Sequence, residues 1–407
     1  MATEQPRLRP QPWMTSPETR RLMKALGAES GLARFVGGCV RDAWLGRPVK
    51  DIDIATPLPP EEVLQRLKAA GLGAVPTGLA HGTVTAIVNH RPYEITTLRR
   101  DVETDGRHAV VAFTTDWEAD ARRRDLRINA LFCDAKGSVW DYVGGAADIA
   151  AGRVRFVGEA RQRIEEDYLR LLRFFRFHAH YGKGEPDPEG LAAATELAPG
   201  LGRISAERKR DELLKLLGAP DPLPVLEIMA EHGVLAQVLP EAGEAGLERL
   251  DRLLALLDDS PPLLRLAALL PEGAEATAAT ARRLRLSNDE RDKLVFLRDA
   301  ASGAPLIADR LGFRRTLQRQ GAGAVLARLL LIDSEPEFLG AAREEASSWE
   351  EKPLPIQGAD LIAAGFAPGP ALGETLRRVE DWWLLEDRRP DKAACLAKAK
   401  EVAERPT

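Results

Sequence analysis

Two aspartates, Asp51 and Asp53, are separated by one residue in the stretch Asp51-Ile52-Asp53-Ile54. In an extended strand, alternate side chains point to the same face, so we expect the two carboxylates to project together. Such a pair suits magnesium ions, which keep part of their water shell and take further oxygens from a nucleotide triphosphate. Paired metals can activate an attacking 3′-hydroxyl and stabilise a pyrophosphate leaving group.

A glycine pair, Gly37-Gly38, precedes the aspartates in a predicted strand–helix–strand context. Glycines before a helix allow close approach to the backbone and leave amide groups free for phosphate. Alone, an Asp-x-Asp is most often a solvated strand edge, and a Gly-Gly is most often a turn. Their combination, with Gly38 13 residues before Asp51, favours a nucleotide-binding function.

The segment Gly37–Thr56 resembles the signature of class II tRNA nucleotidyltransferases and bacterial poly(A) polymerases, within the polymerase β superfamily. Further stretches match in the right order, so the resemblance covers about residues 30–220. It implies that Glu94 is a third carboxylate, the alternative being a surface charge on a hairpin. It also implies that Asp141–Asp148 is a hinge between a head and a neck.

The stretch Arg123–Ala130 resembles the ribose-recognising segment of this family. Asp125 can accept a hydrogen bond from a ribose 2′-hydroxyl, and the arginines can form forked contacts with triphosphate oxygens. Arg127 stands where the family usually has Thr, and we assign it no role.

The stretch Glu166–Arg173 resembles the nucleotide-selecting motif, with Tyr168 where Pro is common. We expect Asp167 and Arg170 to be neighbours on one helix, because they are three positions apart. Asp167 can accept from the amino group that cytosine and adenine share, while Arg170 donates to the ring nitrogen beside it. The alternative is an ordinary intrahelical salt bridge on a solvated face.

These matches define the predicted site. The predicted catalytic residues are Asp51, Asp53 and Glu94, and the predicted Mg²⁺ ligands are Asp51 and Asp53. The predicted nucleotide-binding residues are Gly37, Gly38, Arg41, Arg124, Asp125, Asn129, Asp167, Arg170 and Arg173.

Composition is that of a folded protein, with 44% hydrophobic and 29% charged residues among 407. The net charge of −5 does not indicate a nucleic-acid binder, although arginines cluster at 99–176. The three cysteines are too few for a disulfide framework, and Cys39 and Cys133 are expected to be buried packing residues. We find no long apolar span, so we expect a cytoplasmic protein with no membrane contact. No protein partner is implied.

The predicted fold class is α+β, a nucleotidyltransferase head with a small mixed sheet followed by an all-helical neck, body and tail. The predicted domains are 1–28 (a loose leader to 15 and a helix), 29–150 (head), 151–220 (neck, nucleotide selection) and 221–407 (body and tail, tRNA binding). The predicted strands are Arg34–Val36, Val49–Ala55, Thr83–Val88, Tyr93–Leu98, Ala109–Phe113 and Ala130–Cys133. The predicted helices include Val40–Leu45, Pro60–Ala70, Arg161–His180 and Ser205–Leu217.

The resemblance implies template-independent addition of CCA to tRNA 3′ ends from CTP and ATP. A poly(A) polymerase of the same family, or an enzyme that adds only CC or only A, is the alternative, because the fold does not decide between them. The charged loop Arg100–Arg107 matches the flexible loop implicated in final A addition. A non-catalytic RNA-binding relative is a further alternative, whereas an ATP-driven motor is excluded by the lack of a phosphate-binding Gly-x-x-x-x-Gly-Lys-Ser/Thr loop.

Overall fold

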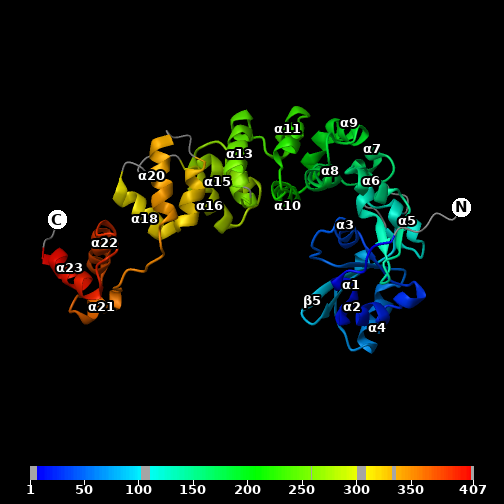
Figure 1. The fold of residues 1–407 in the computed structure, drawn as a ribbon, viewed down its shortest axis with the longest axis horizontal. Coiled ribbons are helices and arrows are strands. Elements are labelled where there is room, and N and C mark those ends of the chain that lie inside the picture. Colours follow the sequence, from blue (N-terminus) through cyan, green and yellow to red (C-terminus); the bar gives the residue numbers. More distant parts are fainter. Residues whose placement is uncertain (1–6, 102–110, 258, 300–308, 332–335, 405–407) are drawn as a thin grey trace. The chain divides into compact units, whose positions relative to one another are not determined.

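The computed structural model describes residues 7–101, 111–257, 259–299, 309–331 and 336–404. Two compact units are present, residues 1–240 and 241–407. The first unit holds every strand of the described residues, and the second is built from helices (Figure 1). The predicted α+β class is therefore confirmed, while the domain borders at 28, 150 and 220 stay predictions.

A mixed sheet forms the centre of the first unit. Within the described residues it has seven strands in the order β3-β4-β5-β2-β1-β8-β9, and β2 and β5 are its parallel pair. A separate ribbon pairs β6 with β7. The strand bounds are β1 Arg34–Val36, β2 Asp53–Thr56, β3 Gly73–Gly78, β4 Thr83–Val88, β5 Arg91–Thr97, β6 Arg99–Asp101, β7 Val111–Phe113, β8 Leu131–Cys133 and β9 Val139–Asp141.

Short helices flank the sheet, and their ends follow the capping signals in the sequence. Ser16 caps the second of them by accepting from the amide of Thr19, and Pro17 occupies its first position. The bounds are α1 Pro12–Thr15, α2 Pro17–Ala25, α3 Gly38–Trp44, α4 Pro60–Ala69 and α5 Trp117–Arg122.

The predicted loose leader is wrong for residues 7–15. The amide of Leu8 donates to the carbonyl of Gly137 at 2.8 Å, and Leu8 is buried. Met14, in α1, is only 1% exposed. Burial of these apolar side chains holds the segment against the head.

Helices alone follow the sheet in the first unit. Their bounds are α6 Gly145–Ala151, α7 Ala160–Glu166, α8 Leu169–Tyr181, α9 Pro188–Leu197, α10 Ala206–Leu217, α11 Leu223–Glu231 and α12 Val234–Val238. Ser205 caps α10 as its type predicts.

The single helix predicted over Arg161–His180 is wrong, because it is broken into α7 and α8 at Asp167-Tyr168. Asp167 has φ −156°, which is extended backbone. The ring of Tyr168 packs so tightly on Gly200 that a Cβ there would lie 1.8 Å from the Tyr168 Cε1 atom. This contact, between residues distant in sequence, fills the space beside the break.

The second unit buries one apolar cluster that includes Phe313, Leu329, Trp349, Val379 and Trp383. Ser287 and Glu290 form a capping box at the start of its fourth helix. The helix bounds are α13 Glu244–Leu256, α14 Pro262–Leu269, α15 Ala274–Arg283, α16 Asn288–Arg298, α18 Arg310–Gln320, α19 Ala322–Leu329, α20 Pro336–Ser347, α21 Gly358–Ala363, α22 Pro370–Leu385 and α23 Lys392–Glu404. Across the described parts of both units, no helix combines the length and apolarity needed to cross a membrane.

The hairpin that carries Glu94 gives a stability prediction. Its two loop residues, Asn89 and His90, have φ values of 48° and 61°, and Asn-Gly is the favoured pair for a turn of this kind. His90→Gly should raise the free energy of unfolding by about 0.5–1 kcal/mol, because glycine adopts positive φ without strain. Urea denaturation measures the change. His90→Ala keeps the Cβ and should bring no gain; an equal gain in both variants would contradict the explanation.

Candidate active site

Two carboxylates lie opposite each other where β2 begins, and Asp51 precedes the first of them by two residues in the chain. Asp53 is the first residue of β2, and the parallel register places it opposite Glu94 of β5. The strand predicted over Val49–Ala55 is shorter than expected, and Asp51 lies in the segment that leads into it. Burial alternates as predicted, because Asp51 is exposed, Ile52 and Ile54 are buried, and Asp53 is half-buried.

The electrostatics of this cluster favour a positive charge. Burial raises the pKa of Asp53 to about 6, and the nearby charges of Glu94 and Asp51 raise it further, while Arg124 opposes them. Among the described residues no three His, Cys, Asp or Glu side chains are gathered as a preformed metal cluster. Hard oxygen donors that repel one another suit a divalent cation, and magnesium often uses one or two carboxylates plus substrate phosphates. The donor set therefore fits such an ion.

The glycine pair lies next to the carboxylates, at the end of β1. Gly37 has φ 73° and ψ −126°, a conformation that residues with a Cβ rarely adopt. Its neighbour Gly38 opens α3. A Cβ on Gly37 would lie 3.6 Å from the Nη1 atom of Arg124, so the turn and that guanidinium are adjacent.

A buried acid that sequence reasoning missed, Asp120, organises the arginines on this side. Its Oδ2 accepts from Nε and Nη2 of Arg124 at 3.1 and 2.9 Å, and its Oδ1 accepts from the backbone amide of Arg99 at 3.0 Å. Arg123 lies 3.8 Å from the same carboxylate. The only sequence signal was the four-residue spacing between Asp120, on α5, and Arg124, which follows the end of that helix.

Asp125 joins the head to α8. Its carboxylate accepts from Arg173 at 2.6 Å, from the Leu126 amide at 2.8 Å and from Asn129 at 3.4 Å. Burial alone would raise the pKa of Asp125, but Arg173 and the amide hydrogen bond bring it below its usual value. Arg173 also approaches Glu212 of α10. The predicted ribose acceptor is therefore ionised and fixed in position.

Arg41 is 6% exposed and lies within a protein network. It donates to Asn129, to the Tyr181 hydroxyl at 2.7 Å and to Asp42 at 2.9 Å. Tyr181 in turn donates to Asp42 at 3.0 Å. The structure thus places Arg41 as a link between α3 and α8, and its nucleotide contact stays a prediction.

The two predicted base-reading residues are not paired with each other. Asp167 lies in the break before α8, so the expectation that both belong to one helix is wrong. The Asp167 carboxylate accepts from the Leu169 amide at 3.1 Å and from Arg208 of α10 at 2.7 Å. Arg170 instead contacts Glu166 at the end of α7. Each side chain is therefore oriented by a different neighbour. The alternative prediction, an intrahelical salt bridge between Asp167 and Arg170, is wrong.

The segment predicted as a hinge is a closely bonded turn. The Asp141 carboxylate accepts from the amides of Val143, Gly144, Gly145 and Ala146 at 2.8–3.1 Å. Arg127, which was given no role, donates to the carbonyl of Phe156 at 3.1 Å. Its own carbonyl lies 2.2 Å from where a Cβ on Gly145 would be, so only glycine fits there. The hinge function stays a prediction.

Two other predictions concern residues outside this cluster. Cys39 and Cys133 are buried, and burial raises the pKa of each thiol to about 12, which fits the packing role. The loop Arg100–Arg107 lies outside the described residues from 102 onward.

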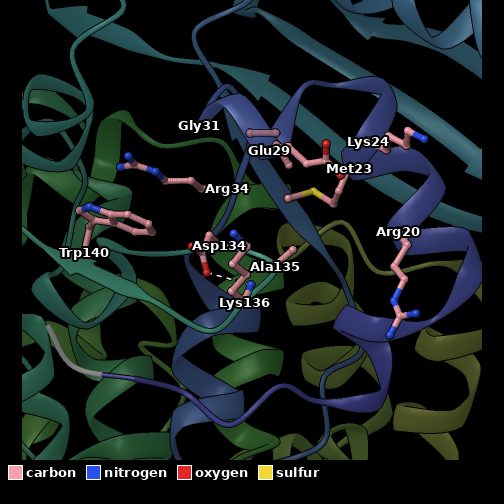
Figure 2. A pocket seen from close by; sticks show the side chains of 12 residues that line it. Arg20, Met23, Lys24, Glu29, Gly31, Arg34, Asp134, Ala135, Lys136 and Trp140 are labelled. Atoms are coloured by element: carbon pink, nitrogen blue, oxygen red, sulfur yellow. Dashed lines mark hydrogen bonds between the residues drawn. The ribbon is translucent and has the colours of Figure 1, made fainter.

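A separate cavity of about 420 Å³ opens at the other end of β1 from Gly37. Figure 2 shows Arg34 beside Trp140 in its wall, with Asp134 and Lys136 nearby. The Arg34 guanidinium lies over the rings of Trp117 and Trp140, 4.1 and 3.8 Å from their centroids. None of the predicted site residues lines this cavity, so the carboxylates and glycines define the candidate site.

Comparison with known proteins places the chain in a family. Residues 33–155 match the model of the poly A polymerase head domain, and residues 185–245 match that of a probable RNA- and SrmB-binding site of polymerase A. The chain is 36% identical to the mitochondrial CCA tRNA nucleotidyltransferase 1 of Danio rerio, over 86% of this chain and 83% of that protein. It is 32% identical to the CCA-adding enzyme of Levilactobacillus brevis, over 90% and 93%.

A solved structure shares the architecture over nearly the whole chain. The crystal structure of the Bacillus stearothermophilus CCA-adding enzyme in complex with CTP has a TM-score of 0.73 and 28% sequence identity to this chain. The match covers 96% of this chain and 98% of that one.

The raised pKa of Asp53 predicts a pH-dependent cost in the metal-free protein. An unfolded aspartate ionises near pH 4, whereas folded Asp53 holds its proton to about pH 6, so stability is lost as the pH rises through this window. Asp53→Asn should therefore be more stable than the wild type by about 1–2 kcal/mol at pH 8, allowing for partial exposure. The difference should shrink toward pH 4.5. Denaturation in EDTA at both pH values measures it, and a pH-independent difference would contradict this origin.

Proposed function

Because the chain belongs to the family of CCA-adding tRNA nucleotidyltransferases, we propose that it adds C, C and A to the 3′ ends of tRNAs. CTP and ATP are the nucleotide donors, and no nucleic-acid template is used. The observation that carries the proposal is the parallel pairing of Asp53 with Glu94 beside the Gly37 turn. Relatives named for this activity match over most of the chain.

In the proposed reaction the tRNA 3′-hydroxyl attacks the α-phosphate of the nucleotide and pyrophosphate leaves. Asp51 and Asp53 would hold a divalent cation, proposed to be Mg²⁺, which supplies positive charge to the reacting phosphate and lowers the pKa of the hydroxyl. Glu94 adds negative charge beside Asp53 and is the candidate third carboxylate. The other residues predicted from the sequence are proposed to bind the nucleotide.

The chain's own residues would bind the nucleotide around this centre. Arg124, next to the Gly37 turn, contacts triphosphate oxygens, since guanidinium groups match phosphate geometry. Asp125 accepts from Arg173, from the Leu126 amide and, at 3.4 Å, from Asn129, so a ribose hydroxyl would replace the long contact with Asn129. Held in one position, Asp125 orients the sugar.

Asp167 and Arg170 would choose the base. Each Asp167 oxygen accepts one hydrogen bond in the structure and has a further lone pair for the amino group of cytosine or adenine. Arg170 keeps donors beyond those facing Glu166 and the Arg163 carbonyl. Uracil and guanine present the reverse order, which would leave both protein groups unpaired at about 1–3 kcal/mol each.

Poly(A) synthesis, or addition of only CC or only A, is the second candidate, because the fold does not decide between these activities. The cytoplasmic location stays a prediction, since relatives of the chain are named as mitochondrial. The role of residues 221–407 in holding tRNA also stays a prediction. Within this region, Arg283 pairs with Glu241.

Nucleotide addition tests the activity directly. With tRNA that lacks its terminus and with labelled CTP and ATP, the protein should add C, C and A and then stop. Asp53→Ala should reduce turnover by about a hundredfold to a thousandfold, the order expected for loss of a main electrostatic element, and should leave tRNA affinity nearly unchanged. An open-ended A ladder would assign the chain to poly(A) synthesis. Wild-type turnover by Asp53→Ala would refute the role of this carboxylate.

Charge reversal at Arg170 tests base selection. Arg170→Glu replaces the donor to the ring nitrogen by an acceptor, so preference for CTP over UTP should fall by about tenfold or more. Competition between the two nucleotides at fixed tRNA measures this. Arg161→Glu, an exposed substitution on α7, is the matched control and should keep the preference. Equal selectivity in Arg170→Glu and wild type would count against the pairing model.

A further inference from the structure

We propose that Asp120 is a positioning residue for the nucleotide triphosphate: it fixes Arg124 with its free edge toward the Gly37 turn. This inference rests on the proposed function, because it concerns the same nucleotide. Nothing in the sequence motifs assigns Asp120 a role. Three observations support it: the edge of Arg124 that Asp120 binds, the burial of Asp120, and the charges around this pair.

Among the described residues, the hydrogen bonds that hold the guanidinium of Arg124 use one edge only. Its Nε and Nη2 donate to the Oδ2 atom of Asp120 at 3.1 and 2.9 Å. Its Nη1 lies beside Gly37, 3.6 Å from the position of an added Cβ. Because the glycine has no side chain, a phosphate oxygen has room next to this nitrogen. The ion pair thus selects the edge that faces the turn.

The pair of Asp120 and Arg124 differs from an ordinary surface ion pair in its burial. The Asp120 side chain is 2% exposed, while that of Arg124 is 20% exposed. A buried carboxylate loses its hydration, and such pairs contribute little net stability compared with apolar packing. The buried acid therefore holds the arginine in one orientation, while the arginine remains accessible to a ligand.

The same helix carries a pair that serves as an internal comparison. Glu118 accepts from Nε and Nη2 of Arg122 at 2.9 and 2.6 Å, again four residues apart. Both of these side chains are largely exposed. The two pairs share their spacing and their forked geometry, and they differ in burial and in nearness to Gly37.

Charge also points to an anionic ligand. Asp120 contacts the Arg99 backbone, the Arg124 side chain and, at 3.8 Å, that of Arg123. Arg99, Arg123 and Arg124 lie near enough to one another to interact electrostatically, so positive groups gather around this carboxylate. Arg124 is close enough to Asp53 to lower the pKa of that carboxyl. The positive group therefore borders the carboxylates, where a triphosphate would lie between them.

Binding of inorganic tripolyphosphate in the presence of Mg²⁺ tests the proposal without a base or sugar. Asp120→Asn should weaken tripolyphosphate, CTP and ATP by the same factor, about tenfold, because the fork onto Arg124 is lost. KM for both nucleotides should rise by that factor, with kcat and tRNA affinity much less affected. If Asp120 had a merely structural role, its loss would lower kcat and tRNA affinity together with nucleotide affinity. Glu118→Gln, which breaks the exposed fork, is the matched control and should change none of them.

Coupling identifies the arginine through which Asp120 acts. Arg124→Gln should lose tripolyphosphate affinity, and adding Asp120→Asn to it should cause little further loss. Losses that simply add, or wild-type tripolyphosphate binding by folded Asp120→Asn, would overturn the inference. If Asp120→Asn does not fold, Arg124→Lys carries the same test, because it keeps the charge and removes the fork. Failure of the wild type to extend tRNA would instead contradict the proposed function.

Discussion

The mutual repulsion of Asp53 and Glu94 is the constraint on which the site depends. Parallel pairing of β2 with β5 fixes these carboxylates opposite each other, and Asp53 is half-buried there. Neither strand alone would create this arrangement, because the residues are separated by forty positions of intervening helix and hairpin. The fold accepts an unfavourable charge at this point, which is typical of functional sites.

Arginines held by buried acids balance that negative charge. Asp120 orients Arg124 on the head, and Asp125 binds Arg173 of α8. Glu212, 4% exposed on α10, binds Arg176 one turn further along α8. The pair of Asp125 and Arg173 joins α8 to the head, and the pair of Glu212 and Arg176 joins α8 to α10. The base-reading residues are thereby placed by the same kind of contact that orders the phosphate-facing arginines.

Most of the architecture could be predicted from local patterns. Arg34–Val36 and Thr83–Val88 were located to the residue, and Ser16 and Ser205 marked helix starts. These signals are local, since they depend on alternation and on capping chemistry. The α+β class was predicted from the order of strands and helices, and the family from the motifs in residues 30–220.

The errors at the candidate site concern long-range packing. The helix break at Asp167 was missed because the apolar stripe continues from Ile164 to Leu171, whereas the contact of Tyr168 with Gly200 cannot be read from spacing. Asp120 was missed because its pair with Arg124 has the same spacing as the exposed pair of Glu118 and Arg122. Only tertiary burial distinguishes the two.

Titration of the Asp53 carboxyl in the metal-free protein tests the central claim most directly. Carbon-13 NMR of this group should give a pKa near 6 in the wild type. It should give a lower pKa in Glu94→Gln, because the substitution removes the neighbouring negative charge. An Asp53 pKa near 4 in the wild type, or one that is unchanged by Glu94→Gln, would contradict the account.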